Sequence, residues 1–277
     1  MVKALSVTLR ANEQERLFRS HTDSIPAYEM FLKARKTHLI ANPETLSKAS
    51  KLYGRIIELD PDFAGGYAGQ SVVLSVGARI GLSNDRKADG LRSLGLANKA
   101  ISVDPEFGWG YIARGGAQIV MGDADAAVSA VQQAVELQPN DADALLFLGI
   151  YKAYAGHEGS GIEDIQASML LDPKPNNRQY FFLGNAFLVN GQFEEAVKAF
   201  EKWDELSPGS IGLVGLAASY ALAGKDDQAT ATVKRYLDKK PDFNASSWKF
   251  LRNFKKTEHQ ELILKGMIKA GFPDQTS

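Results

Sequence analysis

Proline residues recur at a nearly constant interval along this chain of 277 residues. Each follows a short acidic or polar stretch that ends an amphipathic run, and successive prolines lie about 34 residues apart, except for a first interval that is about ten residues longer. They are Pro61, Pro105, Pro139, Pro173, Pro208 and Pro241. A fixed interval of this length is typical of a stacked repeat, in which each unit buries its apolar face against its neighbours.

Within each interval the apolar residues recur at helical spacing, and a glycine stands near the middle. These glycines are Gly122, Gly156, Gly191 and Gly224. Because glycine accepts the backbone angles of a sharp turn, each unit is predicted to be helix, turn, helix. The prolines are expected in the first turn of the following helix, where a missing N–H costs little.

The fifth unit carries a resemblance to a known repeat. It reads Tyr180-x2-Leu183-Gly184-x2-Phe187, then Ala196-x3-Phe200, then Pro208. This is similar to the tetratricopeptide pattern of Trp-x2-Leu-Gly-x2-Tyr, Ala-x3-Phe and Pro. The resemblance implies an all-α fold, a right-handed superhelical solenoid of helical hairpins closed by a C-terminal capping helix.

The pattern divides the chain into three parts. Residues 1–24 are expected to form an N-terminal helical segment or linker, residues 25–242 six hairpins of the tetratricopeptide type, and residues 243–277 C-terminal capping helices. The first helix is predicted from Pro26 to about Ile40, with Ser24 as its cap. The extra residues of the second unit, around Gly81–Lys87, predict longer helices or a loop.

The capping helices are predicted at Asn244 to about Phe254 and at Thr257–Ala270. Thr257–Gln260 has the spacing of a capping box, and Gly271 supplies a stop for the second helix. Such helices would cover the last apolar face of the stack.

Composition argues against catalysis and against several partners. Lys and Arg number 32 against 33 Asp and Glu, without basic blocks, which disfavours nucleic acid or an anionic membrane as partner. Cysteine is absent, the four histidines are scattered, and the glycine clusters lack the spacing of a phosphate-binding loop. We therefore expect no cofactor, no metal and no enzymatic activity. The lack of a leader or a long apolar run predicts a cytoplasmic protein without membrane insertion.

Three passages narrow the resemblance: Ala27–Arg35, Ile57–Gly69 and Leu264–Pro273. Together they are similar to the C-terminal tetratricopeptide region that follows the catalytic domain in many bacterial class III adenylate/guanylate cyclases. The resemblance implies a non-catalytic regulatory and protein-interaction module of a bacterial signalling protein. Two alternatives stay open: an input domain that senses a ligand or peptide, and a free-standing adaptor that self-associates through a helix at Val2–Phe18.

The first helix of each hairpin lines the concave face in this family, so the partner is expected to be a protein or peptide segment bound there. The residues predicted to point into that groove are Trp109, Ile112, Phe147, Ile150, Tyr154, Arg178, Phe181, Asn185, Leu188 and Val189. Their aromatic groups would form an exposed strip for an apolar peptide, so that alanine at Trp109 or Phe181 would weaken binding without unfolding the chain. Asn185 matches a position of the carboxylate-clamp subset, but Phe181 stands where that clamp uses lysine, which disfavours a chaperone-tail receptor.

Overall fold

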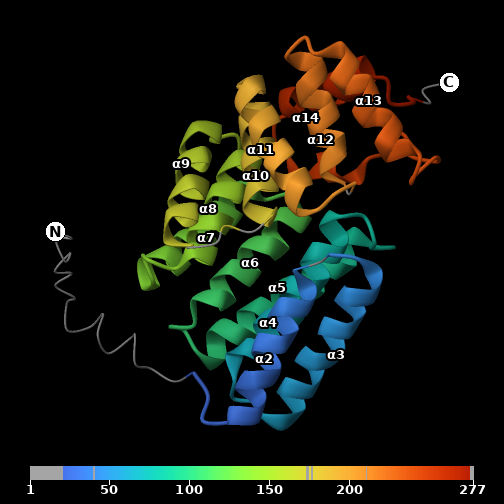
Figure 1. Ribbon diagram of the computed structural model, residues 1–277. Helices are drawn as coiled ribbons and strands as arrows, with labels where there is room; N and C mark the ends of the chain where they lie inside the picture. Colours follow the sequence, from blue (N-terminus) through green and yellow to red (C-terminus); the bar gives the residue numbers. More distant parts are fainter. Residues whose placement is uncertain (1–20, 40, 173–174, 176, 210, 275–277) are drawn as a thin grey trace, which may run out of the picture.

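The computed structural model describes residues 21–39, 41–172, 175, 177–209 and 211–274, and every regular element in these ranges is a helix. The helices follow one another as antiparallel pairs along a curved stack (Figure 1). The pairs are α2 (Ile25–His38) with α3 (Pro43–Leu59), α4 (Ala64–Arg79) with α5 (Arg86–Val103), α6 (Gly108–Met121) with α7 (Ala124–Leu137), α8 (Ala142–Ala155) with α9 (Glu158–Leu171), α10 (Asn177–Val189) with α11 (Phe193–Leu206), and α12 (Gly212–Leu222) with α13 (Asp226–Leu237). A 3₁₀ helix, η1 (Lys249–Asn253), and α14 (Thr257–Ala270) follow. The predicted all-α, right-handed superhelical solenoid is confirmed.

The turn inside four of the pairs contains a glycine in the left-handed region, as predicted. The φ angles are 85° at Gly122, 95° at Gly156, 76° at Gly191 and 77° at Gly224. After α6, for example, the amide of Asp123 donates to the carbonyl of Gln118 at 2.9 Å. Bonds of this kind satisfy carbonyl groups that have no partner at the end of a helix, and they need a residue that tolerates positive φ.

The prolines lie elsewhere than predicted. Pro61, Pro105 and Pro139 each come directly after the C-cap of a second helix and precede the next helix by a short turn. The C-cap before Pro61 is Asp60, with φ −146° and ψ 86°, well outside the helical region. Since proline disfavours helical angles in the residue before it, these prolines end one helix rather than begin the next.

The backbones of α8 and α9 approach closely where glycine faces glycine. A Cβ atom on Gly149 of α8 would lie 2.5 Å from the carbonyl oxygen of Gly161 in α9, and one on Gly161 would lie 2.7 Å from the carbonyl oxygen of Gly149. Both distances are far inside van der Waals contact, so no larger residue fits at either position without moving a backbone. This contact fixes α8 against α9 and orients the inner surface of the fourth pair.

The first helices of successive pairs contact one another, from α2 with α4 through to α10 with α12. The second helices of successive pairs make no comparable contact within the described residues. First helices therefore lie on the inside of the curve and second helices on the outside. The concave surface is accordingly built from α2, α4, α6, α8, α10 and α12.

The first helix of the chain matches its prediction, because α2 covers Ile25–His38 and the hydroxyl of Ser24 accepts a hydrogen bond from the amide of Ala27 at 3.4 Å. The extra residues of the second unit lengthen both helices, to 16 residues in α4 and 18 in α5, and form the loop between them. Helix α5 begins at Arg86, whose guanidinium donates to the carbonyl of Ala78 at 2.9 Å. The predicted helix at Val2–Phe18 lies outside the described residues.

The C-terminal end agrees with the sequence in one part and differs in another. Helix α14 has the predicted bounds, ends at Gly271 with φ 103°, and packs against α12, so it caps the last pair. The other predicted helix, from Asn244 to about Phe254, is only the five-residue η1. The predicted capping box is also wrong, because α14 has no side-chain cap and its N-cap is Lys256. The chain just before α14, including η1, instead runs across the concave surface.

None of the helices described has the length and apolar character that crossing a bilayer requires.

Candidate partner-binding site

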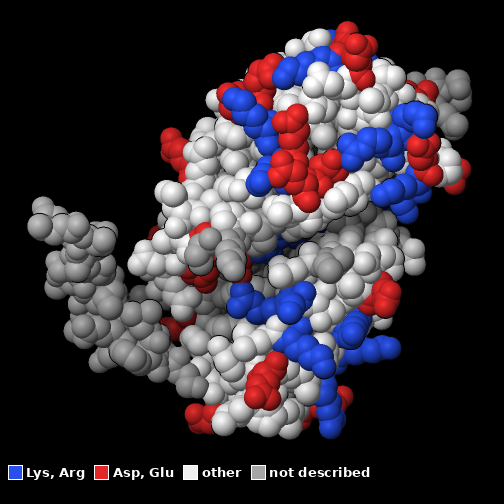
Figure 2. Space-filling model, in the orientation of Figure 1, with Lys and Arg blue, Asp and Glu red and all other residues white. Residues whose placement is uncertain are grey.

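A pocket of about 390 Å³ opens on the concave side between the N-terminal and C-terminal pairs. Figure 2 shows this face hollowed between the two halves, with basic side chains along the edge of the hollow. Four first helices, α2, α6, α8 and α10, supply most of the lining. The lining residues that matter most for its chemistry are Leu32, Arg35, Lys36, Trp109, Asp143 and Arg178.

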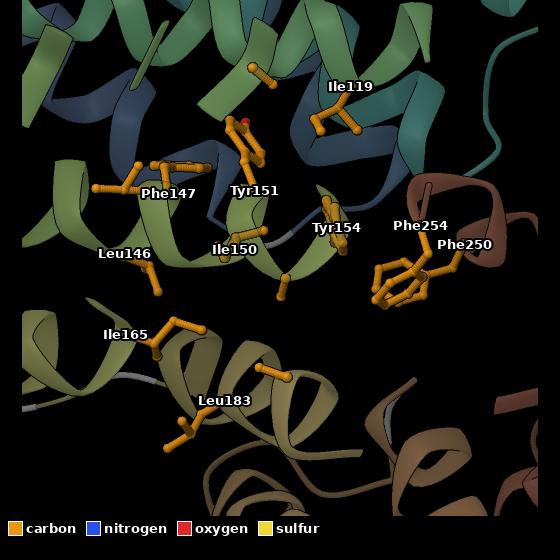
Figure 3. Close-up of a cluster of buried hydrophobic side chains, with 14 of the residues drawn as sticks. Ile119, Leu146, Phe147, Ile150, Tyr151, Tyr154, Ile165, Leu183, Phe250 and Phe254 are labelled. Carbon is orange, nitrogen blue, oxygen red and sulfur yellow. The ribbon is translucent and has the colours of Figure 1, made fainter. Parts of the chain in front are cut away.

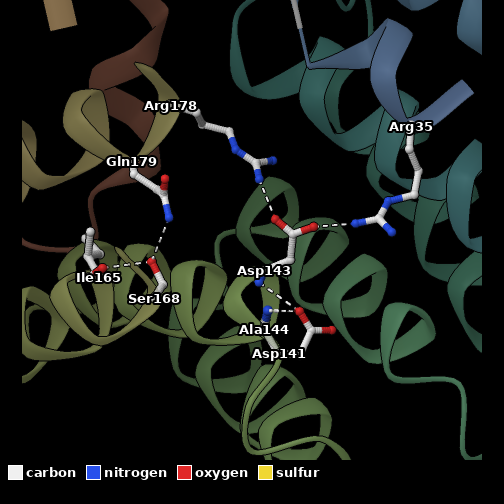
Figure 4. A network of polar contacts seen from close by, with 8 residues as sticks. All are labelled: Arg35, Asp141, Asp143, Ala144, Ile165, Ser168, Arg178 and Gln179. Carbon is white, nitrogen blue, oxygen red and sulfur yellow. Dashed lines mark hydrogen bonds and ion pairs between the residues drawn. The ribbon is translucent and has the colours of Figure 1, made fainter. Parts of the chain in front are cut away.

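Two arginines from distant helices meet on one carboxylate in this pocket (Figure 4). Arg178 of α10 donates to Oδ1 of Asp143 at 2.6 Å, and Arg35 of α2 donates to Oδ2. Burial alone would raise the pKa of Asp143, but the Arg178 and Arg35 charges outweigh it, so the pKa is held below its usual range. The bridge joins the first, fourth and fifth pairs across the inner surface.

The neighbouring carboxylate, Asp141, has a different role. Its Oδ1 accepts hydrogen bonds from the amides of Asp143, at 2.8 Å, and Ala144, at 3.3 Å, and so caps the N-terminus of α8. Burial, together with the Asp143 charge, raises the pKa of Asp141. The cap places Asp143 at the start of α8, where both arginines reach it (Figure 4).

The aromatic side chain of Trp109 packs against the arginine–aspartate bridge. The guanidinium carbon of Arg35 lies 4.3 Å from the centre of the Trp109 ring, a cation–π contact that orients the arginine toward Asp143. Behind Trp109, the His38 ring is buried and its Nδ1 lies 3.0 Å from the hydroxyl of Tyr53. Burial, reinforced by the Arg178 and Arg35 charges, lowers the pKa of His38 to about 4. His38 is therefore neutral at pH 7 and adds no charge to the pocket.

The lining balances charge rather than accumulating one sign. Arg35, Lys36 and Arg178 face the carboxylates of Asp141, Asp143 and Asp172, beside the apolar groups of Leu32, Leu39 and Trp109. Such a surface suits a peptide segment that presents both charged and apolar side chains. Among the described residues no group of three or more His, Asp or Glu side chains is arranged to hold a metal ion.

A second part of the concave surface is covered by the chain itself. Residues Trp248–Lys256, which we call the crossing segment, run from the sixth pair back to α4 and α8. Figure 3 shows Phe250 and Phe254 of this segment beside Tyr154, and the ring centres of Tyr154 and Phe254 are 4.9 Å apart. The inner surface of α8 is therefore filled at this end of the stack.

The residues predicted for the site separate into two groups. Trp109, Phe147 and Arg178 lie together, because the Arg178 guanidinium is 5.2 Å from the Phe147 ring centre and both arginines share Asp143. Tyr154 and Phe181 lie under the crossing segment, where each contacts Phe250.

The expectation of an exposed aromatic strip needs correction. Only Arg178 and Phe181 keep partial exposure, and the other predicted residues are buried; these are Trp109, Ile112, Phe147, Ile150, Tyr154, Asn185, Leu188 and Val189. They are buried because first helices pack on one another and because η1 covers α8. Asn185 donates to the carbonyl of Phe181 in its own helix, at 2.8 Å, rather than facing a ligand.

The sequence did not indicate Arg35, Asp143 or the crossing segment. Arg35 is separated from Asp143 by 108 residues and Asn253 from Arg79 by 174, so no local pattern links them. The one available signal was the pair of basic residues in the last turn of α2, Arg35 and Lys36.

Comparison with known proteins agrees with this architecture. The tetratricopeptide repeat family model matches residues 112–151 and 170–211. The human "Superkiller complex protein 3" is 35% identical over 96 residues, which cover 34% of this chain and 6% of that protein. "Putative adenylate cyclase 3" of Rhizobium meliloti (strain 1021) is 31% identical over 105 residues, covering 38% of this chain and 18% of that protein. The chain thus spans only a small part of each relative.

Among solved structures, the hetero-tetramer Cut9-Hcn1 of the APC/C aligns with a TM-score of 0.61 at 16% identity, over 82% of this chain and 46% of that one. At this identity the similarity concerns the fold alone. The repeat matches, the paired helices and the structural alignment agree with one another. Residues 112–151 and 170–211 therefore match tetratricopeptide repeats, within an all-helical solenoid.

Proposed function

We propose that this chain is a non-catalytic interaction and regulatory module of a bacterial, cytoplasmic signalling protein, and that the pocket around Asp143 receives a peptide segment of its partner. The observation that carries the proposal is the Arg35–Asp143–Arg178 bridge. A ligand that contacts this bridge touches α2, α8 and α10 at once. Binding there would change how the first pair sits against the fourth and fifth, which is what a regulatory module needs.

The finer proposal is that the module is the regulatory arm of an adenylate/guanylate cyclase-like protein. It is supported by the similarity to "Putative adenylate cyclase 3" over 105 residues. On this proposal residues 25–242 are the repeat region and residues 243–277 cap it. The mass of the native gene product would show whether a catalytic domain is joined to this chain.

A second candidate function, self-association, is favoured by exposed apolar side chains of α2 and its C-cap, on the side of the helix that borders the pocket. These exposed side chains are Ile25, Tyr28, Leu32 and Leu39. They recur at spacings that place them on one side of the helix, where a second copy of the chain could cover them. Sedimentation of the purified chain over a range of concentrations distinguishes this adaptor function from a monomeric module.

The pocket proposal is tested with a charge reversal that removes no structural contact. Lys36 lines the pocket and is exposed, whereas Lys33 is exposed on the same helix but does not line it. A library of labelled 12-residue peptides of mixed charge identifies binders by fluorescence polarisation. For such a binder, Lys36→Glu is expected to change the Kd at least tenfold, equivalent to about 1.4 kcal/mol. Lys33→Glu should change it less than twofold, and equal effects of the two variants would contradict the assignment.

A further inference from the structure

The crossing segment, Trp248–Lys256, belongs to no helical pair, yet it makes the longest-range contacts in the described structure. Its central η1 is a single short 3₁₀ helix, and the residues on either side, Trp248 and Phe254, are extended. Helix α14, which follows it, caps the stack mainly by packing on α12, and its Gln260 side chain also donates to the carbonyl of Phe254. The segment is therefore not needed to cover the last pair, and its position over α4 and α8 requires a separate explanation.

Its polar contacts are directed at the ends of two first helices. The Lys249 ammonium donates to the carbonyl of Gly81 at 3.2 Å and the Lys256 ammonium to that of Gly156 at 2.8 Å. The backbone amide of Lys255 donates to the carbonyl of Tyr154 at 2.8 Å. Carbonyl groups at the C-terminal ends of helices lack intrahelical partners and carry partial negative charge, so they accept bonds from cations and from an incoming backbone.

Its apolar contacts concentrate on two aromatic side chains. Phe254 is 2% exposed and lies edge to face with Tyr154, while Phe250 is 8% exposed and contacts both Tyr154 and Phe181. Figure 3 shows the Phe250 and Phe254 rings side by side, next to Tyr154 of α8. A peptide bound to a protein surface typically has this composition: a few aromatic side chains buried as anchors, with exposed basic groups around them.

The segment can leave this surface without disrupting the pairs. It is linked to α13 by about ten residues without a regular helix, and the Lys249 and Lys255 side chains lie at the surface in weak ion pairs or single bonds. Its attachment depends on the buried side chains of Phe250, Leu251 and Phe254, and on the buried Asn253 amide, which donates to the carbonyl of Arg79. Releasing it would uncover Tyr154, Phe181 and the free carbonyls of α4 and α8 together.

We infer that the inner surface over Tyr154 and Phe181 is a binding site for a basic peptide segment with two aromatic residues four positions apart, and that the crossing segment is its internal competitor. A partner protein carrying such a segment binds by displacing residues 248–256. This site lies away from the pocket at Asp143 and does not depend on the signalling role proposed above.

The test uses the full chain and a labelled peptide with the sequence of residues 246–257. Wild-type protein should bind it weakly, because the internal segment occupies the site. A Phe250→Ala/Phe254→Ala variant, in which that competitor is weakened, should bind at least tenfold more tightly. A peptide with alanine at both phenylalanine positions should bind neither protein. Val233→Ala, which removes buried apolar contact in α13 away from this site, should bind as weakly as wild type.

Equal peptide affinity for wild type and the double variant, with both folded by circular dichroism, would overturn the inference. Should the double variant fail to fold, hydrogen exchange in the wild-type chain decides the question. The amide of Lys255 is expected to exchange at least a hundredfold faster than that of Tyr151 in the middle of α8, because the crossing segment opens locally while α8 stays folded. Exchange of both amides at the rate of global unfolding would show that the segment is core and not displaceable.

Discussion

The guanidinium of Arg178 donates a 2.6 Å hydrogen bond to Oδ1 of Asp143, and the pair is only partly accessible to solvent. Because Arg35 binds the other carboxylate oxygen, Asp143 neutralises two cations at once. We predict that Asp143→Asn lowers the free energy of unfolding by about 2 to 3 kcal/mol, since it leaves two guanidinium groups without their counter-ion in a half-buried site. Urea denaturation monitored by circular dichroism measures the change.

The matched control is Glu58→Gln. Glu58 also pairs with an arginine, Arg55, at 2.7 Å, but both side chains are about two thirds exposed. Pairs of this kind contribute less than about 1 kcal/mol, so the control is expected to stay close to wild type. A loss as large in Glu58→Gln as in Asp143→Asn would mean that the bridge has no special role.

His38 predicts a specific pH dependence. Its pKa in the folded chain is lowered to about 4 from an ordinary value of 6.5, first by burial and then by the Arg178 and Arg35 charges. The unfolded chain therefore takes up a proton at a higher pH than the folded chain. The stabilisation due to neutral His38 is complete above about pH 6.5, declines as the pH falls toward 4, and amounts to roughly 3 kcal/mol.

Urea unfolding at pH 7, 5.5 and 4.5 tests this dependence against His38→Gln, which cannot titrate. Between pH 7 and 4.5 the wild type should lose more stability than the variant, by an amount on the order of 2 to 3 kcal/mol. Parallel pH profiles of the two proteins would contradict the prediction.

Two glycines in helices are expected to respond oppositely to alanine. Gly149→Ala places a Cβ 2.5 Å from the backbone oxygen of Gly161 and should destabilise the chain by about 2 kcal/mol or more, since α8 and α9 must separate. Gly95 lies inside α5 with open space where a Cβ would be, so Gly95→Ala should stabilise by about 0.5 to 1 kcal/mol. Thermal melting of both variants measures the sign directly, and the same sign for both would refute the packing argument.

Trp109→Ala is now expected to act on stability. The indole is 6% exposed and its ring contacts both Phe31 and the Arg35 guanidinium. Removing a buried aromatic side chain costs about 3 to 5 kcal/mol. A clear drop in melting temperature is the expected result, and an unchanged one would restore the sequence-based expectation that alanine here affects partner binding alone.

The features of the fold that are determined by residues adjacent in the sequence could be predicted. The turn at Gly156 needs positive φ, and the stop of α14 at Gly271 needs it too, so glycine indicates both. The predicted proline positions are wrong because Pro61 acts on the preceding helix, α3, through its C-cap Asp60. The segment at residues 244–254 is not the predicted single helix: only Lys249–Asn253 form a 3₁₀ helix, and Phe254 is extended and lies against the Tyr154 ring from a distant part of the chain.

The candidate site was less predictable for the same physical reason. Helical spacing shows that Trp109 and Tyr154 face the inside of the curve, but it does not show what lies opposite them. Arg35 lies over the Trp109 ring and Phe254 against the Tyr154 ring. Both covering residues come from parts of the chain that are far away in sequence. Contacts of this kind leave no periodic signal.

The crossing segment also alters how the stack is expected to melt. In an ordinary repeat array each pair touches only its neighbours, so the ends fray first and unfolding proceeds along the array step by step. Here Asn253, close to the C-terminus, donates to the carbonyl of Arg79 in the second pair. The backbone amide of Lys255 donates to the carbonyl of Tyr154 in the fourth pair. The crossing segment therefore couples the C-terminal end to the middle of the array for as long as it is bound. Displacement of the segment by a partner removes this coupling, after which the array is expected to unfold step by step from its ends.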